Sequence, residues 1–130
     1  MSMLDLSPKD VMRGTIIDPA GWYQVRIDTV LDGAPSKDQQ SINIGVEGTI
    51  LKNADSGDTK YEGYPTPRWS FNSKVPGFAV GLLRAAGEEV VPGRVNLKVL
   101  EGKVIEVFIK HGEYNGKPNC EVDHQYRAAR

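Results

Sequence analysis

Aromatic and basic residues alternate over one short stretch of the chain, and a single-stranded nucleic acid needs both kinds of side chain. The stretch contains Tyr61, Tyr64, Arg68, Trp69, Phe71 and Lys74. Aromatic rings stack on exposed bases, at roughly 1–3 kcal/mol per base, while cations contact the phosphates. The stretch therefore predicts stacking and phosphate contacts rather than covalent chemistry.

Positive charge is concentrated near this stretch. The whole chain has 16 Lys and Arg against 17 Asp and Glu, which gives a formal net charge of -1. Residues 67–100 nevertheless hold five Lys or Arg and only two Asp or Glu, and they begin where aromatic residues are densest. This balance excludes a polycationic tail as the mode of nucleic-acid binding, but it leaves room for a local basic patch.

Two further aromatic residues are predicted on the outer face of β-strands. In the predicted strand around Phe108 every second residue is aliphatic, which leaves Phe108 and Lys110 on the opposite face. The same alternation near the N-terminus places Trp22 on one face with Arg26. An outward ring flanked by a cation on a curved sheet predicts a stacking platform.

The clearest turn in the sequence is Asn115-Gly116. Asn-Gly is the strongest short hairpin signal, because both residues tolerate a positive φ. Tyr114 and Lys117 flank this turn. They therefore join the predicted binding set at the tip of a hairpin.

Twelve residues make up the predicted nucleic-acid-binding set. They are Trp22, Arg26, Tyr61, Tyr64, Arg68, Trp69, Phe71, Lys74, Phe108, Lys110, Tyr114 and Lys117. A structural alternative stays open for several of them: Trp69 and Phe71 share one face and would equally fill a core, and Trp22 would cap the end of a barrel. The exposed aromatic patch would also suit a dimer surface.

The residues that usually carry enzymatic chemistry do not form a set. His111 and His124 are the only histidines, and they share no metal-ligand spacing with the single cysteine, Cys120. We expect His111 in a solvated loop, and His124 and Cys120 partly buried on a core face. Glycine-rich phosphate-binding loops are absent. We therefore expect no enzymatic activity, no metal ion and no cofactor.

The elements that must position these residues indicate a mainly β domain, with glycine and proline between short apolar runs. Strands are predicted at Trp22–Leu31, Ser41–Leu51, Thr59–Asn72, Lys103–Lys110 and Asn119–Arg127, with a helix at Val75–Ala86 and a short additional strand at Val95–Leu100. Three strands, one helix and two strands is the element order of the OB-fold, a five-stranded Greek-key barrel. An SH3-like barrel or a small sandwich fits the strand count nearly as well.

The length of 130 residues suits one domain. We expect residues 1–18 to form an irregular lead-in and residues 19–130 to form a single OB-fold-like domain. No stretch approaches the roughly 20 apolar residues of a membrane span, and no signal peptide is visible. With one cysteine and no intramolecular disulfide, the expected location is the cytoplasm, with no membrane partner.

Two different short sequence patterns lie at the two ends of the expected domain. Pro19–Ile27 has the pattern Pro-x-Gly-x-Tyr-x-Val-x-Ile, and Leu100–Asn119 has Gly-Lys, a strand, then Tyr-x-Gly-Lys and Asn. Between them come Phe71-Asn72 and a helix ending Leu83–Gly87. These patterns, in this order, resemble small bacteriophage proteins of the single-stranded-DNA-binding and recombination-associated group, which have an OB-fold.

The resemblance implies a sequence-nonspecific single-stranded-DNA-binding protein of phage DNA replication or recombination, in the host cytoplasm, with replication or recombination proteins as partners. Two features depart from that group: Gln125–Arg130 is not an acidic, partner-recruiting tail, and the net charge is slightly negative. RNA as the ligand and a homodimer as the assembly both stay open. The alternative function is a non-enzymatic β-barrel protein–protein interaction module, or a phage structural or adaptor module, with the aromatic patch as an interface.

Overall fold

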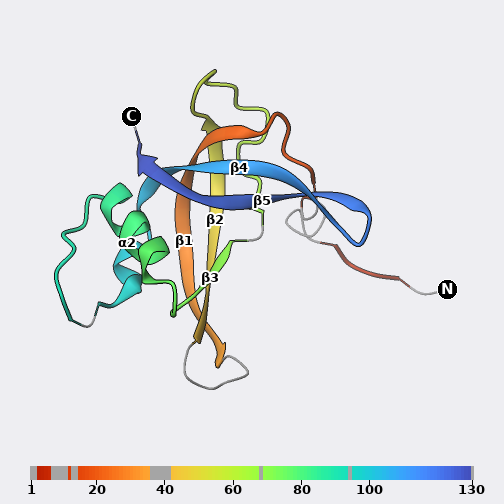
Figure 1. Ribbon diagram of the computed structural model, residues 1–130. Coiled ribbons are helices and arrows are strands. Elements are labelled where there is room, and N and C mark those ends of the chain that lie inside the picture. The colour runs from red at the N-terminus through yellow and green to blue at the C-terminus, as the bar shows by residue number, and fades with distance from the viewer. Residues whose placement is uncertain are drawn as a thin grey trace.

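One antiparallel sheet of five strands forms the body of the molecule in a computed structural model that describes residues 3–6, 12, 15–35, 42–67, 69–93 and 95–129 (Figure 1). The elements are β1 (Gly21–Pro35), β2 (Ile42–Asn53), β3 (Ser70–Asn72), α2 (Pro76–Ala85), the 3₁₀ helix η1 (Leu97–Leu100), β4 (Val104–Tyr114) and β5 (Lys117–Ala128). The strand order is β3-β2-β1-β4-β5. The expected mainly β class, with one short α-helix between the third and fourth strands, is therefore confirmed.

Strand β1 is the centre of the sheet because it pairs with two neighbours. Tyr23 lies opposite Asn53 of β2 on one side and opposite Val107 of β4 on the other. Register shifts interrupt the β1–β2 ladder at three places, and such irregularities bend strands. Figure 1 shows the result, with β4 and β5 running across β1 and β2.

The core lies between the two halves of this bent sheet, and the period-2 alternation of the sequence fills it. Tyr23 and Val25 of β1, with Ile105 and Val107 of β4, are at most 2% exposed. The helix α2 adds Leu82 and Leu83 from its buried side. Burial of apolar area of this kind is the main favourable contribution to folding.

The packed core also includes Ile17, which precedes the expected domain start at residue 19. Its side chain is 2% exposed. The Ile17 carbonyl oxygen lies 2.7 Å from Nε2 of His111, and the neighbouring Ile16 carbonyl accepts a hydrogen bond from the Tyr61 hydroxyl. The expectation that His111 lies in a loop is therefore wrong, since His111 belongs to β4 and fixes the backbone of the segment before β1.

The predicted strand Thr59–Asn72 is wrong over most of its length. Only Ser70–Asn72 pairs with β2, as β3. Pro65 forms an isolated bridge with Thr49. Gly63, Tyr64 and Thr66 also form backbone hydrogen bonds with β2. Proline has no N–H to donate, so Pro65 and Pro67 interrupt this contact and no continuous ladder forms.

The predicted strand Val95–Leu100 is wrong as well. Leu97–Leu100 forms the 3₁₀ helix η1, and the side chain of Asn96 caps it by accepting a hydrogen bond from the backbone N–H of Lys98. Leu97 packs against the core and Leu100 is fully buried. Their spacing of three residues brings both onto one side of a 3₁₀ turn.

The predicted hairpin is confirmed. Asn115 has a φ of 53° and Gly116 a φ of 75°, and Tyr114 pairs directly with Lys117 across the turn. Two successive positive φ angles are what a type I′ hairpin requires, which explains the Asn-Gly pair. None of the helices in the described part of the chain is long and apolar enough to cross a membrane.

Two glycines of β2 differ in what surrounds them. A Cβ atom on Gly48 would lie 2.7 Å from the carbonyl oxygen of Arg26, whereas the nearest atom to a Cβ on Gly45 would be 3.9 Å away. We predict that Gly48→Ala lowers the free energy of unfolding by about 1–3 kcal/mol, because the backbone must shift. Gly45→Ala is the matched control and should leave stability nearly unchanged. Urea denaturation of both variants measures this difference, and equal midpoints would contradict it.

Candidate nucleic-acid interface

Trp22 and Phe108 form an aromatic pair on the face of the sheet opposite the core. They are direct partners in the β1–β4 register, and their ring centroids lie 5.6 Å apart in an edge-to-face arrangement. Their neighbours Tyr23 and Val107 point the other way and are buried, so the predicted outward direction of both rings is confirmed. Both rings are partly exposed.

Arg127 of β5 covers the ring of Trp22. Its guanidinium carbon lies 4.2 Å from the ring centroid. The same guanidinium forms ion pairs with Glu106 and, at 3.3 Å, with Asp55. We call Trp22, Phe108 and Arg127 the Trp22–Phe108 face. A cation over an indole ring is attracted to the negative face of the π system, so Arg127 and Trp22 hold one another in place.

Glu106 lies beneath this face and is only 2% exposed. The alternation predicts it on the outer side, and the β4 register places it there, but Arg127 covers it. The hydrogen bond that Arg127 donates to Glu106 is the largest cause of a raised pKa for Arg127, and Asp55 adds to the effect. Sequence reasoning missed this arrangement. Alternation along β5 already places Arg127 on the outer side, but not opposite Glu106.

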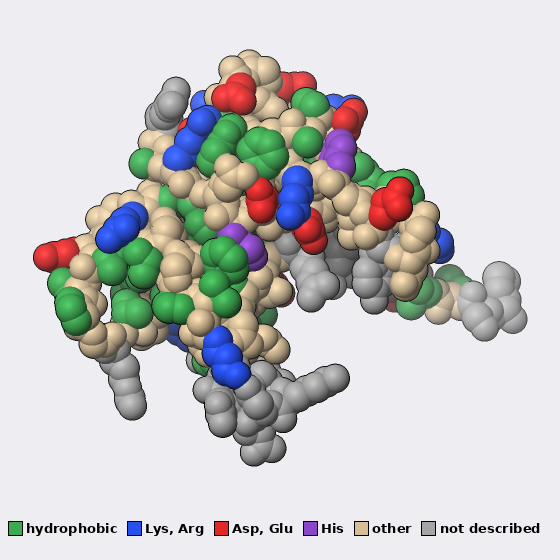
Figure 2. Space-filling model, viewed as in Figure 1, with side chains coloured by type: hydrophobic (Ala, Val, Ile, Leu, Met, Phe, Trp, Pro, Cys, Tyr) green, Lys and Arg blue, Asp and Glu red, His purple; other side chains and the backbone are tan. Residues whose placement is uncertain are grey.

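The other predicted cations on this side of the sheet are paired with carboxylates. Arg26 contacts Asp28 at 2.8 Å. Lys110 lies 3.3 Å from Glu121 and 3.5 Å from Asp123. Both carboxylates raise the pKa of Lys110, and its hydrogen bond to Glu121 has the largest effect. Figure 2 shows positive and negative side chains interspersed over the viewed face rather than a continuous positive surface. Phosphates would have to compete with these carboxylates.

The aromatic residues of the 61–74 stretch lie mostly in the core. Tyr61, Trp69 and Phe71 are at most 9% exposed. Tyr64 is partly exposed and lies edge-to-face against Tyr61 at 5.4 Å. The alternative in which Trp69 and Phe71 fill the core is the one that the structure shows, so neither ring has a free face on which a base could stack.

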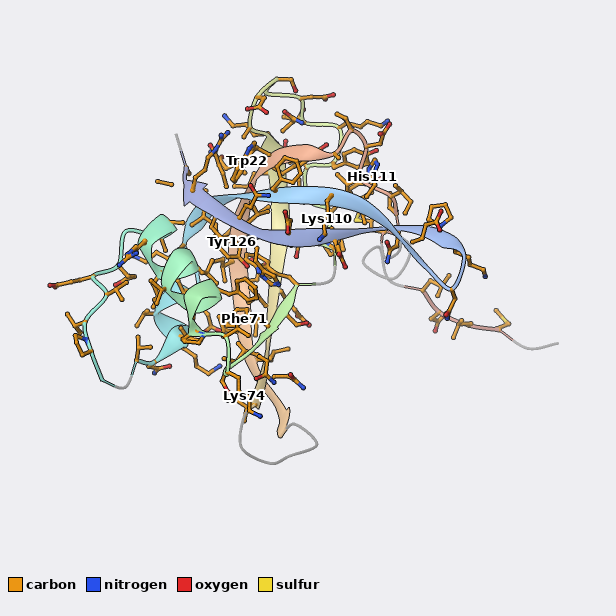
Figure 3. The ribbon with its side chains drawn as sticks, in the orientation of Figure 1. Trp22, Phe71, Lys74, Lys110, His111 and Tyr126 are labelled. Carbon is orange, nitrogen blue, oxygen red and sulfur yellow. The ribbon has the colours of Figure 1, made fainter. Side chains whose placement is uncertain are left out.

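The remaining predicted residues are scattered. Lys74 and Lys117 are exposed, while Arg68 and the side chain of Tyr114 lie outside the described residues. Figure 3 shows Lys74 at the opposite end of the molecule from Trp22. Of the twelve residues, the structure brings Trp22 and Phe108 together as one surface, and it does not join them to the 61–74 stretch.

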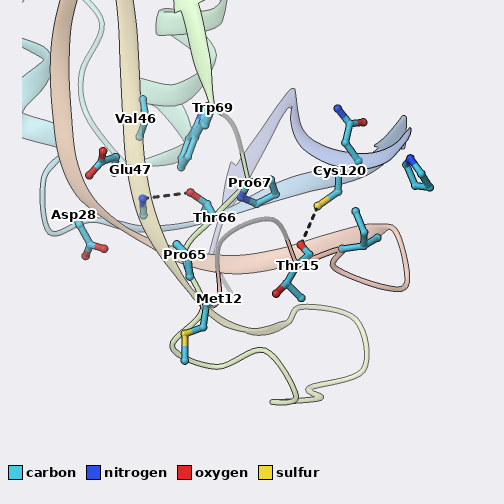
Figure 4. Close-up of a pocket in the computed structure, with 14 residues that line it drawn as sticks. Met12, Thr15, Asp28, Val46, Glu47, Pro65, Thr66, Pro67, Trp69 and Cys120 are labelled. Carbon is cyan, nitrogen blue, oxygen red and sulfur yellow. Dashed lines mark hydrogen bonds between the residues drawn. The ribbon is translucent and has the colours of Figure 1, made fainter. Parts of the chain in front are cut away.

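A cavity of about 500 Å³ lies between the segment before β1, the middle of β2 and the start of β5 (Figure 4). Thr15, Pro67, Trp69 and Cys120 are among the residues that line it. The thiol of Cys120 contacts the Thr15 carbonyl oxygen at 3.7 Å, and burial raises its pKa. A raised pKa disfavours the reactive thiolate, and Cys120 packs against the core.

The described residues contain no group of three or more His, Cys, Asp or Glu side chains that could hold a metal ion. No known family model matches the chain. No curated protein matches it either.

Removing Arg127 should destabilise the protein, because the buried carboxylate of Glu106 would lose its guanidinium partner. We predict that Arg127→Ala lowers the urea midpoint, and that adding Glu106→Gln restores part of the loss by removing the charge. Arg26→Ala is the control, since it breaks an exposed pair and should change the midpoint little. Equal effects of the two arginine substitutions would show that Arg127 does not stabilise the fold in this way.

Proposed function

We propose that this protein binds single-stranded nucleic acid, with DNA as the first ligand to test, without sequence preference and without enzymatic activity. The proposed scaffold is an OB-fold, a barrel that is often partly open. The strand order β3-β2-β1-β4-β5, with α2 between β3 and β4, supports this scaffold. The proposed setting is phage DNA replication or recombination in the host cytoplasm, as the sequence patterns at both ends of the domain suggest.

The single observation that carries the proposal is the Trp22–Phe108 face. Two partly exposed aromatic rings lie side by side on a curved sheet, and a guanidinium lies over one of them. Stacking is tolerant of sequence because every base has a π face, and arginine adds cation–π contacts. This combination favours single strands, whose bases are exposed.

The proposed face belongs to β1 and β4. OB-folds commonly bind oligonucleotides on the face of the second and third strands. In this chain the outer positions of those two strands include Asn43, Glu47 and Asn72, and no aromatic residue lies among them in the described part. The aromatic residues therefore decide where the ligand is placed.

Binding should be sensitive to salt and modest in affinity. Arg127 and Lys110 are already paired with carboxylates. The free energy of a phosphate contact is therefore reduced by that of the ion pair it replaces. The ion pairs of Lys110 are exposed and therefore weak, so a phosphate can replace their carboxylates, whereas the pair of Arg127 with the buried Glu106 stays in place. Affinity falls as salt displaces the phosphate contacts.

We predict that labelled oligothymidine binds at about 50 mM salt and more weakly at about 200 mM salt. Trp22→Ala should weaken binding roughly 5- to 150-fold, the equivalent of one stacked base. Fluorescence anisotropy measures the affinity. Oligothymidine should also quench tryptophan emission, and the quenching should disappear in Trp22→Phe but persist in Trp69→Phe, since Trp69 is buried.

Unchanged affinity in both Trp22→Ala and Phe108→Ala would show that this face is not the site.

A second function is favoured by one observation, the Trp22–Arg127 pair, because tryptophan and arginine are enriched among the residues that dominate protein–protein interfaces. Absence of binding at low salt, together with a solution mass above that of one chain, would assign the face to such an interface.

A further inference from the structure

The two edge strands of the sheet, β3 and β5, are joined by side chains. In the described part of the chain no backbone hydrogen bond links β3 to β5. Instead, Nε1 of Trp69, just before β3, donates a hydrogen bond of 2.9 Å to the hydroxyl of Tyr126 in β5. The two rings also stack at 5.9 Å. Closure of this side of the sheet therefore depends on a few side-chain contacts.

His124 of β5 completes this network, since its Nδ1 lies 2.8 Å from the Tyr126 hydroxyl oxygen. An indole N–H can only donate, so the Tyr126 oxygen accepts the bond from Trp69. With the proton of a neutral His124 on Nε2, Nδ1 accepts the single hydroxyl proton of Tyr126, and every group of the network is then paired. Burial raises the pKa of Tyr126 to about 12, which keeps that proton in place at ordinary pH. The network therefore favours a neutral His124 with its proton on Nε2.

Two phenylalanine rings pack against the partly exposed imidazole. Phe78 of α2 stacks on it at 4.1 Å with an interplanar angle of 17°, and Phe71 of β3 meets it edge-on at 6.2 Å. The strand β3 has no charged residue, and Arg84, the only charged residue of α2, is exposed. His124 is thus the point at which β3, β5 and α2 meet.

Three charged groups act on the imidazole from the strands. Asp123 and Glu121 of β5 favour its charged form, while Lys110 of β4 opposes it. Burial has the largest effect, and it lowers the pKa of His124 below the ordinary value of 6.5. A cation–π contact between a charged imidazole and Phe78 would raise the pKa of His124, but this contribution is modest at such sites.

We propose that His124 is a pH-sensitive latch, whose protonation breaks the side-chain bridge between β5 and the Trp69–β3 segment. A charged imidazole donates from both nitrogens, so Nδ1 would no longer accept the Tyr126 proton. The Tyr126 oxygen would face two donors, and its own proton would have no acceptor within the network. A partly buried donor without a partner and a partly desolvated charge both disfavour the closed arrangement.

The direction of the pH dependence follows from the lowered pKa. Because the closed form prefers neutral His124, it binds fewer protons than the open or unfolded form just below pH 6.5. The stabilisation by the latch is complete above the unfolded pKa of 6.5 and is lost as the pH falls toward the folded pKa. The carboxylates ordinarily titrate lower, and the pKa of Asp123 lies below its ordinary value of 3.8, so the window between pH 6.5 and about 5 separates His124 from the carboxylates.

The test uses the full chain without any ligand, so its outcome is independent of the proposed nucleic-acid binding. NMR follows the indole N–H of Trp69 and the ring of His124 between pH 7.5 and about 5, with Trp22→Phe used only to assign the two indole signals. The expected result is a shift and faster solvent exchange of the Trp69 signal, with the same midpoint as His124 and below pH 6.5.

Two substitutions form a matched pair. In His124→Asn the amide oxygen can take the place of Nδ1 as acceptor but does not titrate, so the transition of Trp69 should disappear. In His111→Gln the amide N–H can take the place of Nε2 toward Ile17, so the transition should remain. A transition that persists in His124→Asn, or disappears in His111→Gln, would overturn the proposal.

Tyr126→Phe keeps the proposal testable if His124→Asn does not fold. Without the hydroxyl, protonation of His124 no longer leaves a donor without an acceptor. The midpoint of His124 should therefore rise toward 6.5, and the Trp69 signal should stop following it. An unchanged midpoint of His124 in Tyr126→Phe, or a wild-type Trp69 signal that ignores the titration, would contradict the latch.

Discussion

The close approach of β2 to β1 at Gly48 is the constraint on which the arrangement of the sheet depends. The Arg26 carbonyl oxygen lies so close to Gly48 that a side chain at this position of β2 would collide with it. Thr66, from the segment leading to β3, also packs against Gly48. Just beyond it the β1–β2 register shifts between Ile27 and Thr29. The bend places β4 along the first part of β1, while Ile27 forms hydrogen bonds with Gly102 and Lys103, just after η1.

The aromatic face depends on that bend through two registers. The β1–β4 register sets Trp22 against Phe108, and the β4–β5 register sets Arg127 against Glu106. The second register contains a shift between Val107 and Phe108, which lets β5 turn Arg127 toward β1. A buried carboxylate is costly unless it is paired, so Glu106 holds the end of β5 over Trp22 and thereby fixes the shape of the face.

Local patterns in the sequence predicted the elements whose signals are local. Alternation located four strands, and Asn115-Gly116 located the hairpin, because φ preferences and period-2 burial are properties of neighbouring residues. The 61–74 stretch was harder to interpret, because strand propensity says nothing about which ring meets which partner. Trp69 packs in the core, where its hydrogen-bond acceptor is Tyr126, 57 residues further along the chain. The cover of Arg127 over Trp22 depends on a similarly distant pairing, which one sequence does not reveal.

The division of the aromatic residues between core and surface limits what one chain can gain from stacking. Tyr61, Trp69 and Phe71 support the core, which leaves two rings on the proposed face. Two stacked bases supply about 2–6 kcal/mol, which corresponds to a Kd no tighter than tens of micromolar. The paired cations add little to that figure at moderate salt. Tight binding to a long single strand would therefore require several chains side by side, each contributing its own small face, and cooperativity along the strand is common among proteins that bind in this way.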